Sequence, residues 1–221
     1  AVDQRLEQLV DFAIDPILGY LTACPTNLGT GMRASSMLHL PGLVLSDQIG
    51  PVLKGINKLG LAVRGLYGEG TESLGNLYQI SNQSTLGESE GEILDRLTRV
   101  IGDVAQYELQ AREKLMTEDS IMLRDRIGRA AGNLSYAHII TSKEALNHLS
   151  MLRLGADLTL LPADLVESCD RLFMETQPAH LQWGAGRKLE PEARDIIRAQ
   201  MIREKLQSSL PPAIDLSGKE N

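Results

Sequence analysis

The 221 residues contain 43% hydrophobic and 23% charged side chains, which is the composition of a folded globular protein. The net charge of −7 argues against binding to nucleic acid or anionic lipid through general charge attraction, because both need an excess of Lys and Arg. No apolar run approaches the length of a membrane span, and the N-terminus lacks the features of a signal peptide, so we expect a cytoplasmic protein.

Short strands joined by turns are predicted for the first third of the chain, because brief apolar runs there are bounded by Gly, Pro, Asn and Ser. Apolar residues at helical spacing predict helices over residues 4–12 and 43–59. Strands are predicted over residues 19–23, 32–40, 61–67 and 77–83. In the second of these strands, alternation places Arg33, Ser35, Met37 and His39 on the less apolar side.

From residue 89 onward the sequence predicts helices alone. Ser89 and Glu92 form a capping-box pattern, Thr141 and Glu144 form another, and Pro191 suits the first turn of a helix. Helices are predicted over residues 93–115, 120–131, 142–152, 163–175 and 191–206. The tail of residues 208–221 is predicted to be disordered.

Two cations and two carboxylates stand out near the predicted strand ends. Arg33 and Arg64 lie in strands, and Glu69 and Glu72 lie in the glycine-rich turn between two of them. Taken alone, these residues favour surface ion pairs and a solvated hairpin somewhat over a site.

Two motifs in this region carry a family resemblance. Residues 20–35 (YLTACPTNLGTGMRAS) closely resemble the CPTNxGT signature of ATP:guanido phosphotransferases, the phosphagen kinase family. Residues 63–70 and 79–82 resemble the nucleotide-binding hairpin of that family, and the resemblance extends over nearly all of residues 18–206. The sequence of these motifs resembles that of the bacterial branch that phosphorylates arginine side chains in proteins.

The resemblance implies an α+β fold. We expect an antiparallel sheet flanked by helices, of the glutamine-synthetase-like type and incomplete at its N-terminus, in a catalytic part over residues 1–117. An all-helical region over residues 118–207 would bind phosphoarginine and form a homodimer. The implied function is transfer of the γ-phosphoryl group of ATP, with Mg²⁺, to arginine residues of protein substrates.

The resemblance also implies roles for individual residues. Glu69 is expected to accept a proton from the attacking guanidinium, and Glu72 is the alternative because hairpin lengths differ between branches. Cys24 resembles the reactive cysteine of the family, although a small buried hydrophobe is an equal alternative. The nucleotide-binding residues are expected to be Arg33, Ala34, Ser35, Ser36, Met37, Arg64, Gly65, Leu66, Tyr67, Gly68 and Glu69.

A third motif lies near the C-terminus. Residues 194–199 (RDIIRA) resemble the RDxxRA motif by which the protein-arginine branch is implied to bind phosphoarginine. Arg194 and Arg198 are four residues apart and share a helix face, and Asp195 can pair with Arg198. Two guanidinium forks suit a phosphorylated guanidine. The alternative is a solvated face of a helix that is buried through Ile196, Ile197 and Met201.

The N-terminal arginine-rich and NEED-type motifs of the family do not occur in these residues, so the chain is either a fragment or a shortened protein. Two alternatives to the kinase stay open, a non-catalytic phosphoarginine-binding or dimerisation module and a kinase for a small free guanidine. The family implies a Clp-type protease system as a partner and leaves open whether an activator protein is needed. We expect no resident metal ligands from Cys or His, since neither residue type is clustered.

Overall fold

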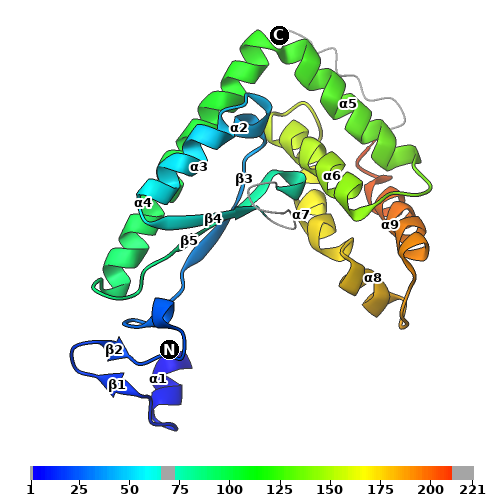
Figure 1. Ribbon diagram of the computed structural model, residues 1–221. Helices are drawn as coiled ribbons and strands as arrows, with labels where there is room; N and C mark the ends of the chain where they lie inside the picture. The colour runs from blue at the N-terminus through cyan, green and yellow to red at the C-terminus, as the bar shows by residue number, and fades with distance from the viewer. Residues whose placement is uncertain (1, 66–72, 211–221) are drawn as a thin grey trace.

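The computed structural model describes residues 2–65 and 73–210. Two long helices, α4 (Glu90–Glu118) and α5 (Ser120–Tyr136), meet at Asp119 and form the legs of an inverted V (Figure 1). A small sheet with two short helices lies along α4, and a cluster of helices lies along α5. Each group has its own hydrophobic core.

The sheet has three antiparallel strands in the order β3 (Ser35–His39), β5 (Leu77–Asn82) and β4 (Leu61–Gly65). Alternate residues of each strand point to opposite faces, and the face that includes Leu61, Tyr78 and Ile80 is buried in the core with residues of α4. The prediction of an α+β fold with an antiparallel sheet flanked by helices is confirmed.

The single helix predicted over residues 43–59 is wrong. The structure has two helices, α2 (Pro41–Leu45) and α3 (Ile49–Lys58), separated by a turn at Asp47, whose φ of 58° is left-handed. The break lets the two helices pack differently: α2 lies against α4, whereas α3 lies against β4. Apolar spacing along the sequence does not distinguish these two directions.

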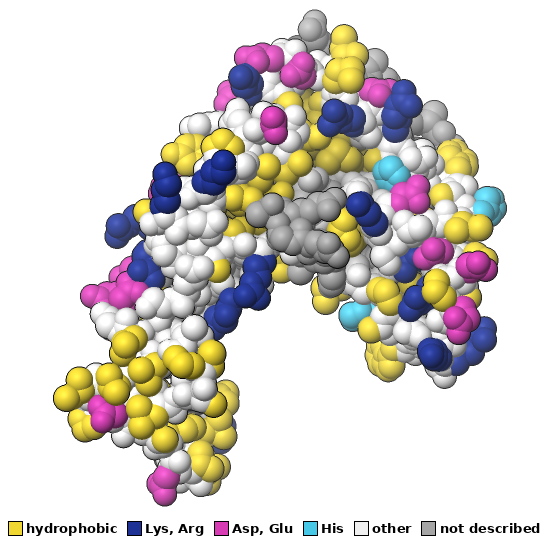
Figure 2. Space-filling view, in the orientation of Figure 1, with side chains coloured by type: hydrophobic (Ala, Val, Ile, Leu, Met, Phe, Trp, Pro, Cys, Tyr) yellow, Lys and Arg dark blue, Asp and Glu magenta, His cyan; other side chains and the backbone are white. Residues whose placement is uncertain are grey.

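The N-terminal segment is less regular than predicted. Helix α1 (Val2–Glu7) ends before Phe12, and the strand predicted over residues 19–23 is reduced to β2 (Gly19–Tyr20), which pairs with the unpredicted β1 (Ile14–Asp15). A 3₁₀ turn, η1 (Pro25–Asn27), follows. Many apolar side chains of this segment are exposed and gather at the lower left of Figure 2, namely Val2, Leu6, Leu9, Val10, Phe12, Ile14, Ile17, Leu18 and Leu21.

The helical half contains α6 (Ser142–Asp157), α7 (Leu165–Glu175), α8 (Pro178–Gly184) and α9 (Pro191–Leu206) in addition to α5. Both predicted caps form, since Ser89 and Glu92 make a complete capping box and Thr141 accepts the N–H of Glu144. Helix α8 was not predicted.

The end of the described chain is packed rather than loose. Ser209 donates to Asp164, and Leu210 is buried, so the disorder predicted from residue 208 does not hold for these positions. Residues 211–221 lie outside the described part. None of the helices in that part combines the length and apolar character that a membrane span requires.

A buried carboxylate joins the sheet half to α4. Glu108 is 4% exposed and accepts hydrogen bonds from the backbone N–H groups of Gly42 and Leu43, at 2.8 and 2.9 Å, in the first turn of α2. It also pairs with Arg112 at 2.6 Å. Arg112 in turn pairs with Asp157 at the end of α6, at 2.9 Å, so the network extends into the helical half.

A histidine forms the second link between the halves. His39, at the end of β3, lies 2.7 Å from the hydroxyl of Ser150 on α6 through its Nε2 atom. Burial, together with the positive charges of Arg112 and Arg153, lowers the pKa of His39 to about 3. The imidazole is therefore neutral at physiological pH.

Replacing Glu108 with Ala should lower the free energy of unfolding by about 3 kcal/mol, because it leaves two backbone donors and the Arg112 charge without their buried partner. Urea unfolding at fixed protein concentration measures this. The matched control is Glu113→Ala, an exposed glutamate on the same helix, which should change the free energy by less than about 0.5 kcal/mol. Equal effects would contradict the role of Glu108.

His39 should make the fold sensitive to mild acid. The unfolded imidazole titrates near the ordinary value of about 6.5 and the folded one at about 3, so between these values the unfolded chain binds more protons and falling pH destabilises the fold. The contribution lost between pH 7 and pH 5 should be about 2 kcal/mol. His39→Gln should flatten this dependence in urea unfolding, whereas His180→Gln, at an exposed position, should preserve it.

Candidate functional site

The loop of residues 24–31 is fastened to the segment that follows β5. The hydroxyl of Thr85 donates to the carbonyl oxygens of Leu28 and Thr26, at 2.7 and 3.1 Å, and the Thr85 carbonyl accepts the N–H of Thr30 at 2.9 Å. Gly29 has a φ of 107°, and a Cβ there would lie 2.2 Å from the Thr85 carbonyl oxygen. This position therefore requires glycine, and the conformation of the loop depends on it.

Cys24 stands at the start of this loop and is exposed. Its Sγ lies 3.0 Å from the Thr26 hydroxyl, and hydrogen bonds from this hydroxyl and from the Thr26 backbone N–H lower the pKa of the Cys24 thiol. The alternative of a small buried hydrophobe is therefore wrong for Cys24. It fits the second cysteine, Cys169, which is buried and whose thiol pKa is raised by that burial to about 12.

The polar face of the sheet collects the predicted cations. Arg64 of β4 lies opposite Gln79 of β5, and Gln79 donates to the Ser35 hydroxyl of β3 at 3.0 Å. Arg33 precedes β3, and its guanidinium donates to the Ser81 hydroxyl at 3.2 Å, two residues along β5 from Gln79. Both arginines are exposed and reach the same side of the sheet. Figure 2 shows Lys and Arg side chains along the inner side of this leg.

Asn82 sets the position of Arg33. Its side-chain oxygen accepts the N–H of Ala34 at 2.8 Å, and its side-chain NH₂ group donates to the carbonyl of Met32 at 3.0 Å. Asn82 therefore holds the backbone on both sides of Arg33, although β3 itself begins only at Ser35.

The other predicted nucleotide-binding residues divide into three groups. Ser35 and Met37 share the polar face with the arginines and are exposed. Ala34, Ser36 and Gly65 belong to the opposite side, where Ala34 packs against the hydrophobic core of the sheet half. Side-chain contacts from Ala34 and Ser36 to a ligand on the polar face are therefore not available. Leu66, Tyr67, Gly68, Glu69 and the alternative base Glu72 lie outside the described residues.

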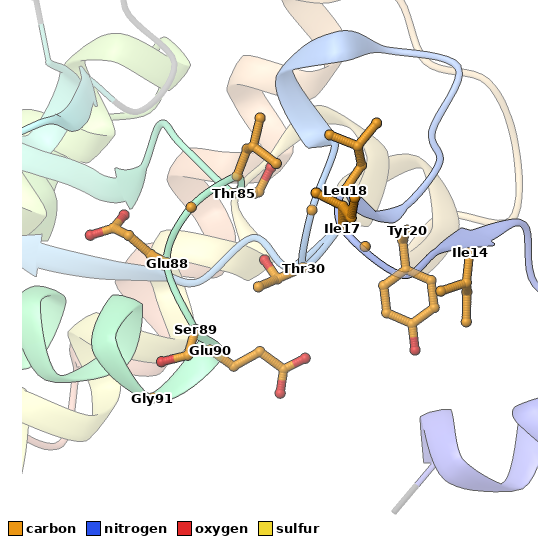
Figure 3. A pocket seen from close by; sticks show the side chains of 14 residues that line it. Ile14, Ile17, Leu18, Tyr20, Thr30, Thr85, Glu88, Ser89, Glu90 and Gly91 are labelled. Atoms are coloured by element: carbon orange, nitrogen blue, oxygen red, sulfur yellow. The ribbon is translucent and has the colours of Figure 1, made fainter.

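A cavity of about 790 Å³ lies beside the loop, between the N-terminal segment and the start of α4 (Figure 3). Ile17 and Leu18 line one side, and Thr85, Glu88 and Glu90 line another. Of the predicted site residues that the structure describes, none is in its lining, so the cavity is separate from the polar face of the sheet.

The arginines of the RDIIRA motif have different environments. Arg198 is 1% exposed and donates to the carbonyl oxygens of Thr176 and Ile140, at 2.9 and 2.8 Å, and it pairs with Asp195. Its donors are therefore used to hold α9 against the helical core. Arg194 is half-buried and makes no side-chain hydrogen bond or ion pair within the described part of the chain.

The buried face of α9 differs from the one expected for a simple amphipathic helix, which would be buried through Ile196, Ile197 and Met201. It consists of Arg198, Ala199, Ile202 and Leu206, whereas Ile196 is 50% exposed. Of the motif's three polar residues, the ones with accessible surface are Arg194 and Asp195.

Several residues that shape the site were not singled out from the sequence. Thr26, Asn82 and Thr85 position the loop and Arg33 through hydrogen bonds to backbone groups. His39 was assigned no role, although strand alternation already placed it on the face of Arg33. No sequence signal marked Thr85, because its partners are more than fifty residues away.

The described residues contain no group of three or more His, Cys, Asp or Glu side chains that could hold a metal ion. Mg²⁺ in kinases is held by one or two carboxylates together with substrate phosphates and water, so its binding does not require such a group.

Comparisons with known proteins match both halves of the chain. The family model described as "ATP:guanido phosphotransferase, C-terminal catalytic domain" matches residues 1–111, and the one described as "Protein-arginine kinase McsB C-terminal domain" matches residues 120–216. A protein-arginine kinase from Moorella thermoacetica is 52% identical over 206 residues, which is 93% of this chain and 59% of the relative. One from Syntrophomonas wolfei is 49% identical over 94% of this chain and 58% of the relative.

Part of the chain is also similar to a solved structure. The lombricine kinase in this crystal structure is 33% identical in sequence, and the match has a TM-score of 0.41 and covers 48% of this chain and 29% of that chain. The chain thus spans somewhat more than half the length of the two protein-arginine kinases described above. The first family model covers half of the residues, and it includes the CPTNLGT loop, Arg33 and the strand that carries Arg64. The chain belongs to the ATP:guanido phosphotransferase family.

Proposed function

We propose that this chain is the larger part of an ATP-dependent protein-arginine kinase, which transfers the γ-phosphoryl group of ATP to arginine side chains of proteins. The observation that carries the proposal is that Arg33 and Arg64 lie on the same exposed, polar face of the sheet. This face is next to a loop that contains the exposed Cys24. The relatives named protein-arginine kinase support the choice of a protein substrate over a small free guanidine.

The arginines suit the phosphate groups of ATP. Phosphoryl transfer needs the charge of the migrating group to be neutralised while donor and acceptor are held in line. Guanidinium forks bind phosphate oxygens in bidentate geometry, and two of them on one face can hold adjacent phosphates. Mg²⁺ would accompany ATP and further neutralise the charge of its phosphates. The nucleotide would lie across β3 and β4, with Ser35 and Met37 beneath it.

The acceptor needs a base. A guanidinium has a pKa above about 12, so a carboxylate must hold it and take its proton as it attacks. Glu69 is the proposed base and Glu72 the alternative, and both follow β4 in the sequence. Cys24, with its lowered thiol pKa, is proposed to lie beside the guanidine as a hydrogen-bond partner.

The RDIIRA motif of α9 is proposed to bind phosphoarginine away from the catalytic face. Arg194 is the proposed phosphate ligand, since its guanidinium is accessible and has no partner in the described structure. Arg198 and Asp195 would set the shape of this pocket through their own ion pair. The helical half is also the proposed homodimer interface, and a Clp-type protease and an activator protein are the proposed partners in a cytoplasmic degradation system.

Glu69→Gln in the complete gene product should lower phosphoarginine formation on a model protein at least about 100-fold, because it removes the proton acceptor and keeps the shape. ATP affinity, measured by calorimetry, should change less than about twofold, since glutamine keeps the shape of the side chain and the arginines that are proposed to bind phosphate are unchanged. Mass spectrometry of the substrate protein, prepared without strong acid, measures the phosphoarginine that is formed.

The matched variant is Glu72→Gln, which should retain most of the activity. The opposite result, with Glu72→Gln inactive and Glu69→Gln active, would assign the base to Glu72. If the complete gene product forms no phosphoarginine at all, the kinase proposal is wrong, and the phosphoarginine-binding module remains.

Arg194→Lys should weaken binding of a phosphoarginine peptide by about tenfold, because it keeps the charge but removes the bidentate fork. Fluorescence anisotropy with a labelled peptide measures the affinity. Arg187→Lys, at an exposed position of the same half, is the control and should bind like the parent. Parental affinity in Arg194→Lys would show that Arg194 acts only as a point charge or not at all.

A further inference from the structure

Helix α6 reaches across to the sheet through polar side chains. The side-chain oxygen of Asn147 accepts the backbone N–H of Gly75 at 3.0 Å. One turn further on, the Ser150 hydroxyl accepts from the side-chain NH₂ group of Asn76 at 2.8 Å and contacts His39 at 2.7 Å. These bonds join the helical half to the end of β3 and to the start of β5, which are neighbours in the sheet because His39 lies opposite Leu77.

The bonded turn has an unusual backbone. Gly75 and Asn76, in the 3₁₀ turn η2 (Leu74–Asn76), both have left-handed φ angles, 65° and 55°. A Cβ on Gly75 would lie 3.0 Å from the Leu146 carbonyl oxygen, so the turn is pressed directly against α6. Glycine and asparagine both adopt left-handed backbone readily, so the turn forms without strain, and the hydrogen bonds from α6 fix its position against the helix.

These hydrogen bonds fix the orientation of the turn more than they hold the turn against α6. Leu74 and Leu77 already pack against the hydrophobic core of the helical half, so burial alone would keep the turn in place on α6. Hydrophobic contact is non-directional, whereas a hydrogen bond to one particular N–H group defines how the turn is rotated. The turn leads into β5, which carries Gln79 and Ser81 on the polar face.

The start of α6 is held in place by the RDIIRA motif of α9. Ile140 stands just before the N-cap Thr141, and its N–H donates to the Asp195 carbonyl at 3.2 Å while its carbonyl accepts from Arg198 at 2.8 Å. A single helix therefore has its start fixed by the proposed phosphoarginine motif and its middle bonded to the sheet.

We propose that Asn147 and Ser150 are positioning residues for phosphoryl transfer, which orient the η2 turn and thereby strand β5, with Gln79 and Ser81 on its polar face. The inference rests on the proposed function, because it concerns the same catalytic face. Its structural part stands on the described hydrogen bonds alone, and the two can fail separately.

The test compares Asn147→Ala with Asn147→Asp in the complete gene product. Aspartate keeps the oxygen that accepts the Gly75 N–H, and position 147 is exposed enough to carry its charge, whereas alanine removes the acceptor. Asn147→Ala should lower kcat about tenfold with the KM for ATP changed less than about twofold, and Asn147→Asp should recover most of the loss. Asn133→Ala is the matched control, since Asn133 contacts only His148 within the helical half.

Hydrogen exchange gives a readout that does not depend on activity. The amide of Gly75 should exchange about tenfold faster in Asn147→Ala and at nearly the parental rate in Asn147→Asp and Asn133→Ala. Unchanged exchange at Gly75 in Asn147→Ala would overturn the inference. So would a parallel fall of kcat and melting temperature that aspartate does not reverse, because that pattern indicates a general loss of stability.

Absence of kinase activity in the parent would overturn the proposed function, and the exchange rates at Gly75 would then decide the anchoring by themselves. Ser150→Ala serves as a second variant. It leaves both His39 and Asn76 without their shared partner, so it should lower kcat in the same direction and also reduce stability.

Discussion

The requirement to satisfy one buried carboxylate shapes the meeting point of the two halves. Glu108 lies inside the protein, where an unpaired charge is costly, and its oxygens are satisfied by two backbone N–H groups of α2 and by Arg112. The network continues through Arg112 to Asp157 on α6. Because each partner is itself part of a helix, satisfying this charge sets the mutual placement of α2, α4 and α6.

This placement explains why the sheet has one closed and one open face. The break between α2 and α3 allows α3 to cover the apolar face of β4, while α2 stays at Glu108. The opposite face keeps Arg33, Ser35 and Arg64 exposed, and the loop containing Cys24 is fastened beside it by Thr85. The chain therefore offers a cationic surface, on which we propose that the phosphates of a nucleotide are held.

The RDIIRA motif of the helical half combines a buried arginine with an accessible one. Arg198 is used as a structural residue that ties α9 to the start of α6, whereas Arg194 remains available to a ligand. The two arginines of this motif thus differ in burial. Because α6 also contacts the sheet through Asn147 and Ser150, the proposed phosphoarginine site at α9 and the proposed catalytic face are connected through a single helix.

Local patterns in the sequence were sufficient for the strand alternation around Arg33, the caps at Ser89 and Thr141, and the motifs that identify the family. These features depend on residues within a few positions of one another, or on a short contiguous motif. The division of 43–59 into α2 and α3, the burial of Arg198 and the neutral His39 were decided only by tertiary structure. Their causes are contacts between residues far apart in sequence, such as Glu108 with Gly42 and Ser150 with His39, which no local spacing can reveal.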